Sequence, residues 1–360
     1  MKIFVLGTRG FPNIQGGAEK HCEQLYPFMS NDAEIVVFRR KPYVKKEAQK
    51  KWKNISFVDL PSTTIKGVEA LLHTFLSTIY SIFKRPDIAH IHNIGPGLMV
   101  PFLRLFGIKV VVTYHSPNYE HKKWSAIGRI ILRLGEWLSL KFANAVIFVN
   151  KFQMAKLSSN GENKMIYIPN GVAINEADNR FDKLSEWGLE PFSYILAVGR
   201  ITPEKGFDLL LSAHKELNTN KKLVIVGAVE AEKNYFESLK ELKNQNAIFL
   251  GYQSGEPLKQ LYQNACLFVL SSYNEGFPLV LLEAMSYGKP ILASDIPASH
   301  LIELNTEDYF KCGDKNDLVN KLQNKLNSPK DIKCTYLLDD YRWESIAKST
   351  YNVYKHLFDK

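Results

Sequence analysis

The sequence predicts an α/β protein of two domains, each built on a parallel sheet that helices cover. Its 360 residues exceed one usual domain and suit two of about 150–200 residues each. Short apolar segments alternate with helical patterns, which is typical of parallel sheets covered on both faces. The alternation pauses at the turn signal Pro169-Asn170-Gly171-Val172 and the polar stretch over residues 175–190. We therefore expect domains over residues 1–172 and 173–338, with residues 339–360 packing back on the first domain.

The composition is that of an ordinary globular protein, with 45% hydrophobic and 23% charged residues. The apolar run over residues 2–6 is too short for a signal peptide, and no run approaches the ~18 apolar residues of a membrane span. The cysteines at positions 22, 266, 312 and 334 have neither a metal-binding spacing nor a disulfide framework. We expect reduced cysteines and a cytoplasmic protein.

Positive charge is concentrated in the first half. Residues 1–172 hold 24 Lys and Arg against 11 Asp and Glu, a balance of +13, whereas residues 173–360 hold 22 against 26, a balance of −4. An anionic surface or substrate is expected against the first half, and the alternative is that its lysine-rich loops are merely solvated. No nucleic-acid partner is expected, because no zinc spacing or RNA-binding aromatic motif accompanies the charge.

The first domain holds a series of strand candidates. In a parallel sheet ligands bind beyond the carboxyl ends of the strands, so the residues that follow strands matter most. Here these are the segment from Gly7 to Gly17, His92-Asn93, His115-Ser116 and Asn150. The expected strands cover residues 2–6, 34–38, 55–58, 87–92, 109–114, 145–149 and 165–168.

Two glycine clusters follow the first strand. Gly7 and Gly10 open a loop, Gly16 and Gly17 close it, and a helix is expected over residues 18–29. Strand, glycine loop and helix together offer backbone N–H groups and a positive helix end to an anion. The spacing matches neither the dinucleotide fingerprint nor a P-loop. The alternative is a tight turn that needs glycine dihedral angles.

His115 follows a strand and precedes Ser116-Pro117-Asn118. A lone histidine is more often structural than catalytic. Its place at the carboxyl end of a strand favours a functional role, so both interpretations stay open.

Two apolar stripes with helical spacing lie beside basic residues. One spans residues 68–83 and ends in Lys84-Arg85, and the other begins with Lys122-Lys123-Trp124 and continues to residue 134. Residues 39–53 add eight basic residues and one acid. Such stripes can rest on an anionic bilayer, and the alternative is a helix whose apolar stripe faces the core.

The second half restarts the α/β pattern, with strands expected at residues 194–198, 222–226, 247–250, 266–270 and 290–293. The loop after the first of these strands, Gly199 to Phe207, carries Arg200 and Lys205. A guanidinium can bind a diphosphate bidentately and an ammonium adds a point charge, so the loop predicts diphosphate binding. The alternative is a solvated charged loop.

The segment 274–290, NEGFPLVLLEAMSYGKP, places Glu275 and Glu283 eight residues apart. Glu275 falls in a turn-like segment, and Glu283 falls in a helix expected to begin near Pro278, which suits a first helical position. Eight residues make about two helical turns, so both carboxylates can face one cleft. The bare spacing arises by chance in many chains, so its weight depends on the surrounding motifs.

Taken in order, four features resemble the family 4 glycosyltransferases of the GT-B architecture: the Gly16-Gly17 loop, the turn at residues 169–172, the loop over residues 199–206, and the paired glutamates. The opening residues 7–12 resemble a bacterial subgroup that includes rhamnosyltransferases of surface polysaccharide synthesis. The resemblance implies two Rossmann-like domains facing each other across a cleft. The first would bind the acceptor and the second a nucleotide sugar, and a C-terminal helix would cross back to the first.

The resemblance also implies roles for individual residues. Arg200 and Lys205 would bind the donor diphosphate, Glu275 and His115 would contact the donor sugar, and Glu283 would accept hydrogen bonds from the ribose. Further donor-binding positions implied by the motifs are Gly17, Gly199, Gly251, Tyr252, Gly276 and Phe277. Many relatives have an acid just after the histidine, where this chain has Ser116, so acceptor details do not carry over through that loop.

The implied activity is retaining transfer of a sugar from a UDP-, GDP- or dTDP-linked donor to a saccharide hydroxyl. No cofactor or metal is expected, because the sequence has no Asp-x-Asp motif to hold Mg²⁺. The expected acceptor is a lipid-linked intermediate of bacterial polysaccharide synthesis, at the inner face of an anionic membrane. Two alternatives remain: a GT-B-type sugar-nucleotide epimerase and a non-catalytic nucleotide-sugar-binding protein.

Overall fold

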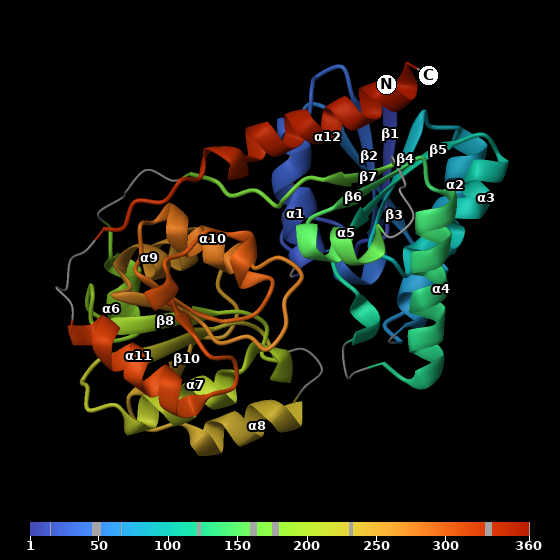
Figure 1. Cartoon of the computed structure of the whole chain (residues 1–360). Coiled ribbons are helices and arrows are strands. Elements are labelled where there is room, and N and C mark those ends of the chain that lie inside the picture. Colours follow the sequence, from blue (N-terminus) through green and yellow to red (C-terminus); the bar gives the residue numbers. More distant parts are fainter. Residues whose placement is uncertain are drawn as a thin grey trace. The chain divides into compact units, whose positions relative to one another are not determined.

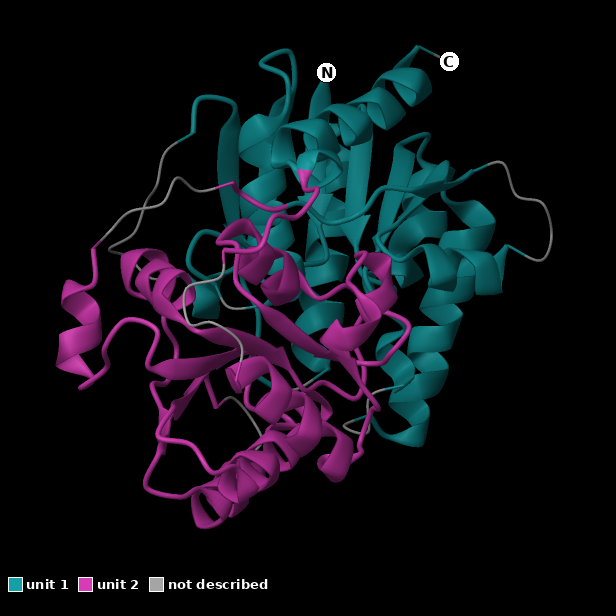
Figure 2. Cartoon of the chain, turned by 60° about the vertical axis from the view of Figure 1, so that its left-hand side comes forward, with its two compact units in different colours: residues 1–171, 339–360 teal, residues 172–338 magenta. Residues whose placement is uncertain are grey.

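The computed structural model describes residues 1–14, 16–44, 52–65, 67–120, 124–158, 164–174, 180–229, 233–327 and 333–359. The chain divides into two compact units, shown in Figure 2. Unit 1 comprises Met1–Gly171 together with Asp339–Lys360, and unit 2 comprises Val172–Leu338. These limits lie within one residue of the expected ones. Parts of the basic segment 39–53, of the stripe from residue 122 and of the polar stretch 175–190 lie outside the described residues.

Unit 1 is built on a parallel sheet of seven strands in the order β3-β2-β1-β4-β5-β6-β7. All of its expected strands are confirmed, with small shifts at their ends. Phe4 of the inner strand β1 pairs with Val36 on one side and with Ala89 on the other. The strands are β1 (Lys2–Leu6), β2 (Glu34–Arg40), β3 (Ile55–Leu60), β4 (Ile88–His92), β5 (Lys109–Tyr114), β6 (Ala145–Phe148) and β7 (Met165–Tyr167).

Helices cover this sheet, and two groups of them pack together: α1 against α12, and α3 against α2 and α4 (Figure 1). Apolar side chains of α3 and α4, such as Leu103 and Leu132, join the buried cluster on strands β1, β2, β4, β5 and β6. The helices of unit 1 are α1 (Gly17–Leu25), α2 (Val68–Lys84), α3 (Val100–Leu105), α4 (Ala126–Phe142), α5 (Lys151–Leu157) and α12 (Trp343–Phe358).

Helix α2 turns its polar side toward the protein. Thr74, Ser77, Thr78 and Ser81 are buried, and each hydroxyl donates to the carbonyl four residues earlier. This local bond satisfies a buried hydroxyl without a partner from the core. The apolar stripe of α2 is exposed, up to 81% at Phe83, so the interpretation of a core-facing stripe is wrong for this helix.

Helix α4 approaches the protein through small residues. A Cβ at Gly135 would lie 2.2 Å from the Ile94 carbonyl oxygen, and a Cβ at Gly97 would lie 2.0 Å from Ser139 Oγ. Leu132 is buried, but most apolar positions of the stripe are exposed, among them Ile127 at 71%. Among the described residues, no helix has both the length and the apolar character required to cross a bilayer.

Unit 2 is built on a second parallel sheet, of six strands in the order β10-β9-β8-β11-β12-β13. Its strands are β8 (Tyr194–Val198), β9 (Lys222–Val226), β10 (Ala247–Phe249), β11 (Leu267–Leu270), β12 (Ile291–Ser294) and β13 (Tyr309–Phe310). Its helices are α6 (Asp182–Glu186), α7 (Phe207–Glu216), α8 (Lys233–Leu242), α9 (Gly255–Asn264), α10 (Leu279–Ser286) and α11 (Lys315–Asn327). A buried apolar cluster joins α7, α8 and α11 to the sheet.

The elements differ from expectation at several ends. Helix α1 stops at Leu25, and a 3₁₀ turn over Tyr26–Phe28 follows, because Pro27 has no N–H to continue the α-helical ladder. Helix α10 begins at Leu279, one residue after Pro278. The two-residue strand β13 and helix α6 were not expected, since both lie in polar surroundings without a clear apolar period.

The C-terminal helix packs on the first unit, as expected. The indole of Trp343 lies over Gly171, where a Cβ would approach its ring to 2.6 Å. Farther along α12, the Tyr354 hydroxyl lies 2.5 Å from His90 Nδ1, and both residues are fully buried. Residues more than 250 positions apart thus share a buried hydrogen bond.

Removing the Tyr354 hydroxyl is expected to destabilise unit 1. Tyr354→Phe removes one of the two hydroxyls that contact buried His90 Nδ1, which costs about 0.5–1.5 kcal/mol of unfolding free energy. Tyr351→Phe, a matched change on the same helix, is expected to stay within ~0.5 kcal/mol of the parent. Urea denaturation followed by circular dichroism measures both, and equal midpoints for the two variants would contradict the prediction.

Candidate active site

In unit 2, the loops that follow β8 and β9 lie against each other. The Gly199 N–H donates to the Val226 carbonyl, and the Ile201 N–H donates to the Ala228 carbonyl. A Cβ at Gly227 would lie 1.7 Å from the Gly199 carbonyl oxygen, so only glycine fits between the two loops. This contact fixes the segment that carries Arg200, whose side chain is half-buried.

Lys205 and Glu275 meet at this edge of the sheet. Lys205 Nζ lies 2.5 Å from Glu275 Oε1, and the two side chains are only 18% and 10% exposed. The Ser272 hydroxyl donates to the same oxygen at 2.7 Å. Two of the motifs singled out in the sequence therefore come together, and the carboxylate holds the ammonium group in place.

The backbone supports this ion pair. The Ser271 hydroxyl donates to the Lys205 carbonyl at 2.8 Å, and the Tyr273 N–H donates to the Glu204 carbonyl at 2.8 Å. Gly206 has φ +62°, and a Cβ there would lie 2.2 Å from the Ser271 carbonyl oxygen. Gly206 is thus required both by its dihedral angle and by the close approach of the loop that follows β11.

Glu283 lies on α10, where a tyrosine of α9 holds it. The Tyr262 hydroxyl donates to Glu283 Oε2 at 2.8 Å, and the Tyr262 ring stacks on Tyr287 with centroids 5.7 Å apart. Burial raises the pKa of Tyr262 well above its usual value, and the negative charge of Glu283 adds to the rise. Tyr262 therefore stays protonated and keeps donating to the carboxylate.

The other donor-binding positions expected in unit 2 differ in how far they are exposed to solvent. Gly251 has φ +66°, no atom lies within 4 Å of the position that its Cβ would take, and its carbonyl accepts from the Gly227 N–H at 2.8 Å. Tyr252 is exposed, whereas Phe277 is buried. Gly276 is half-buried beside Glu275. The structure brings Lys205 and Glu275 into contact, while Glu283 is anchored separately by Tyr262.

In unit 1, the two glycine clusters have different surroundings. A Cβ at Gly7 would lie 2.3 Å from the His92 carbonyl oxygen, and one at Gly10 would lie 2.5 Å from the Arg39 side chain. Both glycines also have positive φ angles, +94° and +106°, so packing and dihedral angle both require glycine, in agreement with the tight-turn interpretation. Gly17 begins α1, and no atom lies within 4 Å of the position that its Cβ would take. Its backbone is therefore accessible to a ligand.

His115 follows β5 and belongs to a cluster of histidines. His115 Nε2 lies 3.0 Å from His92 Nδ1, and His21 packs edge-on against His115 with ring centroids 4.9 Å apart. His21 Nδ1 lies 2.7 Å from Asn170 Oδ1. His115 is therefore not the lone histidine that the sequence suggested, although its position at the end of the strand is confirmed.

Burial controls the protonation of this cluster. It lowers the pKa of His21 to about 4, although the hydrogen bond to Asn170 opposes the shift. It also lowers the pKa values of His92 and His115 well below the usual value, and repulsion from neighbouring imidazoles lowers them further. All three imidazoles are therefore neutral near pH 7.

Sequence reasoning missed several residues that hold the site. Tyr262 and Ser272 position the two glutamates, and His21 and Asn170 support His115. His21 stands four residues after Gly17 on the same helix, so helical spacing beyond the glycine loop was the available signal. Asn150, by contrast, caps α5 by accepting from two backbone N–H groups, which is a structural role.

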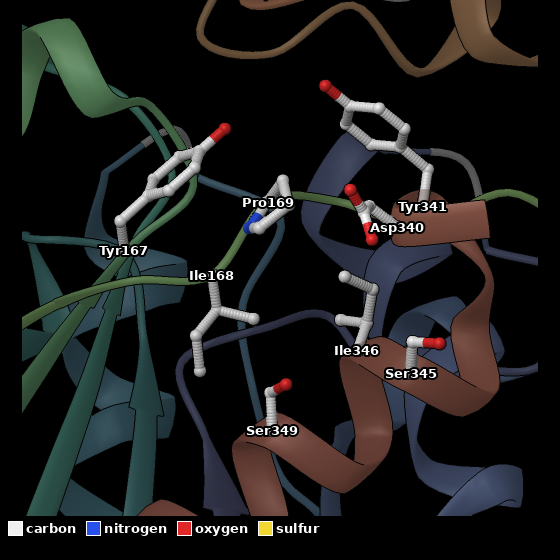
Figure 3. A pocket seen from close by; sticks show the side chains of 8 residues that line it. All are labelled: Tyr167, Ile168, Pro169, Asp340, Tyr341, Ser345, Ile346 and Ser349. Atoms are coloured by element: carbon white, nitrogen blue, oxygen red, sulfur yellow. The ribbon is translucent and has the colours of Figure 1, made fainter. Parts of the chain in front are cut away.

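A cavity of about 310 Å³ lies elsewhere in unit 1, between the end of β7 and the start of α12. Figure 3 shows the rings of Tyr167 and Tyr341 on opposite sides of it, with Ile168 and Ile346 between them. Burial raises the pKa of Tyr167 to about 12. None of the residues expected at the donor site lines this cavity, which adjoins the turn where the chain leaves unit 1.

Two family comparisons match the two halves of the chain. Residues 15–176 match the family described as Glycosyltransferase Family 4, and residues 179–336 match the family described as Glycosyl transferases group 1. Each match covers most of one unit.

Curated relatives agree with these matches. The chain is 32% identical over 186 residues to the uncharacterized glycosyltransferase MJ1607 of Methanocaldococcus jannaschii, covering 45% of this chain and 44% of the relative. It is 31% identical over 223 residues to lipopolysaccharide 1,2-N-acetylglucosaminetransferase of Salmonella typhimurium, covering 54% and 57%. The chain thus spans about half the length of these two relatives. It is 25% identical to MJ1178 of M. jannaschii over 97% of both chains.

Solved structures share the fold. Sucrose-phosphate synthase from Thermosynechococcus elongatus has a TM-score of 0.84 at 22% identity, with 99% of each chain covered. Anabaena Alr3699/HepE, solved in complex with UDP-glucose, has a TM-score of 0.72 at 18% identity, with 100% of this chain and 98% of that chain covered. The expected GT-B fold, with two Rossmann-like units in one chain, is confirmed.

Glycine at position 206 is expected to be required for the stability of unit 2. Gly206→Ala places a Cβ against the Ser271 carbonyl and keeps an L-residue at φ +62°. Gly251→Ala serves as the matched control, because it has φ +66° but no atom within 4 Å. The control is expected to lose about 1–2 kcal/mol of unfolding free energy, and Gly206→Ala is expected to lose about 1–3 kcal/mol more. Equal denaturation midpoints for the two variants would show that the loop can move away.

Proposed function

We propose that this chain is a family 4 glycosyltransferase, which transfers a sugar from a nucleoside diphosphate donor to a saccharide hydroxyl. The observation that carries the proposal is the contact between Lys205 Nζ and Glu275 Oε1 at 2.5 Å, which joins two motifs 70 residues apart. When a cation pairs with a carboxylate at the carboxyl edge of a parallel sheet, a bound diphosphate can replace the carboxylate as its partner. Arg200 lies in the same loop and adds a second cation.

In this proposal the cations stabilise the leaving group. Negative charge builds on the diphosphate oxygen as the bond to the sugar breaks, and preorganised cations lower the energy of that state. Lys205 is largely shielded from water, so its charge acts through a lower dielectric than a surface lysine. We assign this role to Arg200 and Lys205 with no metal ion between carboxylates and phosphates.

Glu283 is assigned to the ribose. Its carboxylate is held by the Tyr262 hydroxyl and therefore has a fixed orientation. The ribose of UDP or GDP offers two neighbouring hydroxyl donors, which suit the two oxygens of a carboxylate, whereas the deoxyribose of dTDP offers one. Gly251 and Tyr252 are assigned to the base, while Gly276 and Phe277 are assigned to the sugar end beside Glu275. Within unit 1, Gly17 and His115 are assigned to contacts with the donor sugar.

We propose that the transfer retains the anomeric configuration by attack on the same face. The bond between the anomeric carbon and the phosphate oxygen breaks, and the diphosphate keeps the electron pair. The acceptor oxygen bonds to that carbon on the face being vacated, and its proton passes to the departing phosphate oxygen. A double displacement would require two carboxyl groups about 5–5.5 Å apart beside the sugar. In this assignment Glu283 is occupied with ribose, so Glu275 has no such partner.

The donor is proposed to be a hexose linked to UDP, GDP or dTDP, with rhamnose favoured by the opening motif of residues 7–12. Two relatives support a sugar donor, since one is a lipopolysaccharide 1,2-N-acetylglucosaminetransferase and the other an amylovoran biosynthesis glycosyltransferase. A thermal-shift screen of nucleotide sugars would identify the donor, because a bound ligand stabilises the folded state.

The acceptor is proposed to be a lipid-linked saccharide at the cytoplasmic face of an anionic membrane. The support is the outward apolar side of α2, α3 and α4, three helices that pack in series. Phe83 and Leu105 are 81% and 80% exposed. Basic residues of these helices and their ends accompany the apolar ones: Lys84, Arg85, Arg104, Arg129, Arg133 and Lys141. Apolar side chains beside cations suit the surface of an anionic bilayer.

Arg200→Ala and Lys205→Ala are expected to lower kcat by about 100–1,000-fold, with a smaller effect on acceptor KM, because the charge is required mainly in the transition state. Lys240→Ala removes an exposed cation of α8 and serves as the control, with kcat unchanged. Unchanged turnover in both site variants would refute the diphosphate role. Conversion of the donor without acceptor by the parent protein would instead indicate an epimerase.

No covalent sugar adduct is expected on Glu275. The protein would be incubated with a slow donor such as a 2-fluoro sugar nucleotide, and its intact mass and peptides would be measured by mass spectrometry. Same-face attack leaves the mass unchanged, since no protein group forms a bond to the sugar. A sugar-sized increase mapped to Glu275 would replace this mechanism with a double displacement.

The surface of α2 and α3 is expected to bind anionic vesicles. Phe83→Gln with Leu105→Gln is expected to reduce the bound fraction severalfold without loss of stability, since both side chains are exposed. Leu337→Gln, which changes a residue of unit 2 that is 90% exposed, is the control. Sedimentation with phosphatidylglycerol vesicles at two salt concentrations measures the effect. Equal binding of parent and double variant would argue against this surface.

A further inference from the structure

Three histidines of unit 1 lie with one ring nitrogen each close to the other two. Only one of these histidines, His115, has a role in the proposed transfer. His21 lies on α1, His92 ends β4 and His115 follows β5, and the three ligand atoms lie within 4.8 Å of one another. We propose that His21, His92 and His115 form a binding site for a transition-metal dication of the Zn²⁺ type. This site is separate from the diphosphate chemistry assigned to unit 2.

The spacing is close to that of a tetrahedral site. Zinc binds imidazole nitrogen at about 2.0–2.1 Å, so two nitrogens on a tetrahedral ion are about 3.4 Å apart. His92 Nδ1 and His115 Nε2 are already 3.0 Å apart. The widest separation in the set, at most 4.8 Å, has to close by about 1.4 Å, which small rotations of the side chains can supply.

Outer hydrogen bonds leave a lone pair on one nitrogen of His21 and of His92, and the contact between His92 Nδ1 and His115 Nε2 is then donated by His115. When His21 Nδ1–H donates to Asn170 Oδ1, at 2.7 Å, the lone pair of His21 is on Nε2. When His92 Nε2–H donates to the Tyr26 hydroxyl, also at 2.7 Å, the lone pair of His92 is on Nδ1, the atom that faces His115. Such outer partners fix the tautomer and raise the basicity of metal-binding histidines.

The three histidines differ in exposure, and the most exposed of them leaves a path by which an ion can enter. His21 and His92 are buried, whereas His115 is half-buried. A metal binds the lone pair of an imidazole nitrogen, so the hydrogen on His115 Nε2 has to move to Nδ1 when the ion binds. The set consists of imidazoles alone, which favours Zn²⁺, Co²⁺, Ni²⁺ or Cu²⁺ over the oxygen-seeking ions Mg²⁺ and Ca²⁺.

A bound ion would connect several elements of unit 1. It would join α1, β4 and the end of β5 directly. The Tyr26 hydroxyl also lies 2.9 Å from His90 Nδ1, which contacts Tyr354 of α12. Metal binding is therefore expected to raise the Tm of the protein as the ion concentration rises. Because His115 is also assigned to the donor sugar, the ion would compete with that contact.

The test uses Co²⁺ as a spectroscopic probe and the full chain, freed of any affinity tag and dialysed against a chelator. The parent protein is expected to bind one Co²⁺ per chain, with visible absorption typical of tetrahedral coordination, and Zn²⁺ is expected to displace it. His21→Gln and His115→Gln are expected to weaken binding at least about tenfold. His300→Gln is the control, because His300 lies 2.6 Å from Asp295 and the two side chains offer an ion an alternative place to bind on the surface.

Substitutions of Asn170 test the same site without removing a ligand. Asn170→Asp gives His21 a carboxylate partner and is expected to tighten Co²⁺ binding, a gain that misfolding cannot imitate. Asn170→Ala is expected to weaken binding by about 10–100-fold. Absence of Co²⁺ binding by the parent, or equal affinities in the parent, His21→Gln and both Asn170 variants, would overturn the proposal. Loss of Co²⁺ binding in His300→Gln, but in none of the other variants, would place the metal on the surface and would also overturn the proposal.

Discussion

Parallel pairing brings the carboxyl ends of neighbouring strands to one edge of a sheet, and the candidate sites of both units depend on this constraint. In unit 2 it places the loop after β8 beside the loop after β11, so that Lys205 reaches Glu275 across 70 residues of sequence. In unit 1 it places His92, at the end of β4, beside His115, which follows β5. Each of these four residues lies at the end of a buried strand or on the loop that follows it.

Glycines and hydroxyl groups make these edges close enough for chemistry. Gly227 and Gly206 let neighbouring loops touch through their backbones. Ser271 then connects the loop of Glu275 with that of Lys205, and Ser272 holds Glu275 within its own loop. The ion pair is consequently preorganised before any ligand arrives, which reduces the reorganisation that a reaction requires. Small residues also permit close packing on α2 and α4, where small or hydroxylated residues face the protein and large apolar residues face outward.

Much of the fold could be predicted from sequence because buried parallel strands are continuous apolar runs bounded by turn signals. Strands β8 and β9 were predicted to the residue, and most others to within two. The motif residues Lys205 and Glu275 were also recognisable, since their loops have glycine and proline in fixed places. Tyr262 and Asn170 could not be assigned roles, because their importance comes from contacts with residues 21 and 149 positions away. For His21 the one signal was its helical spacing from Gly17.

The sequence by itself determined the two-unit α/β organisation, the order of strands and helices, and the chemical groups available at the end of each strand, because these follow from local apolar periods and turn residues. Only the tertiary structure decided which groups meet. It paired Lys205 with Glu275, gathered His115 with His92 and His21, and turned the apolar side of α2 outward. Periodicity shows that a helix has an apolar side, but packing decides whether that side is covered, and at α2 the buried hydroxyls bond to their own helix instead.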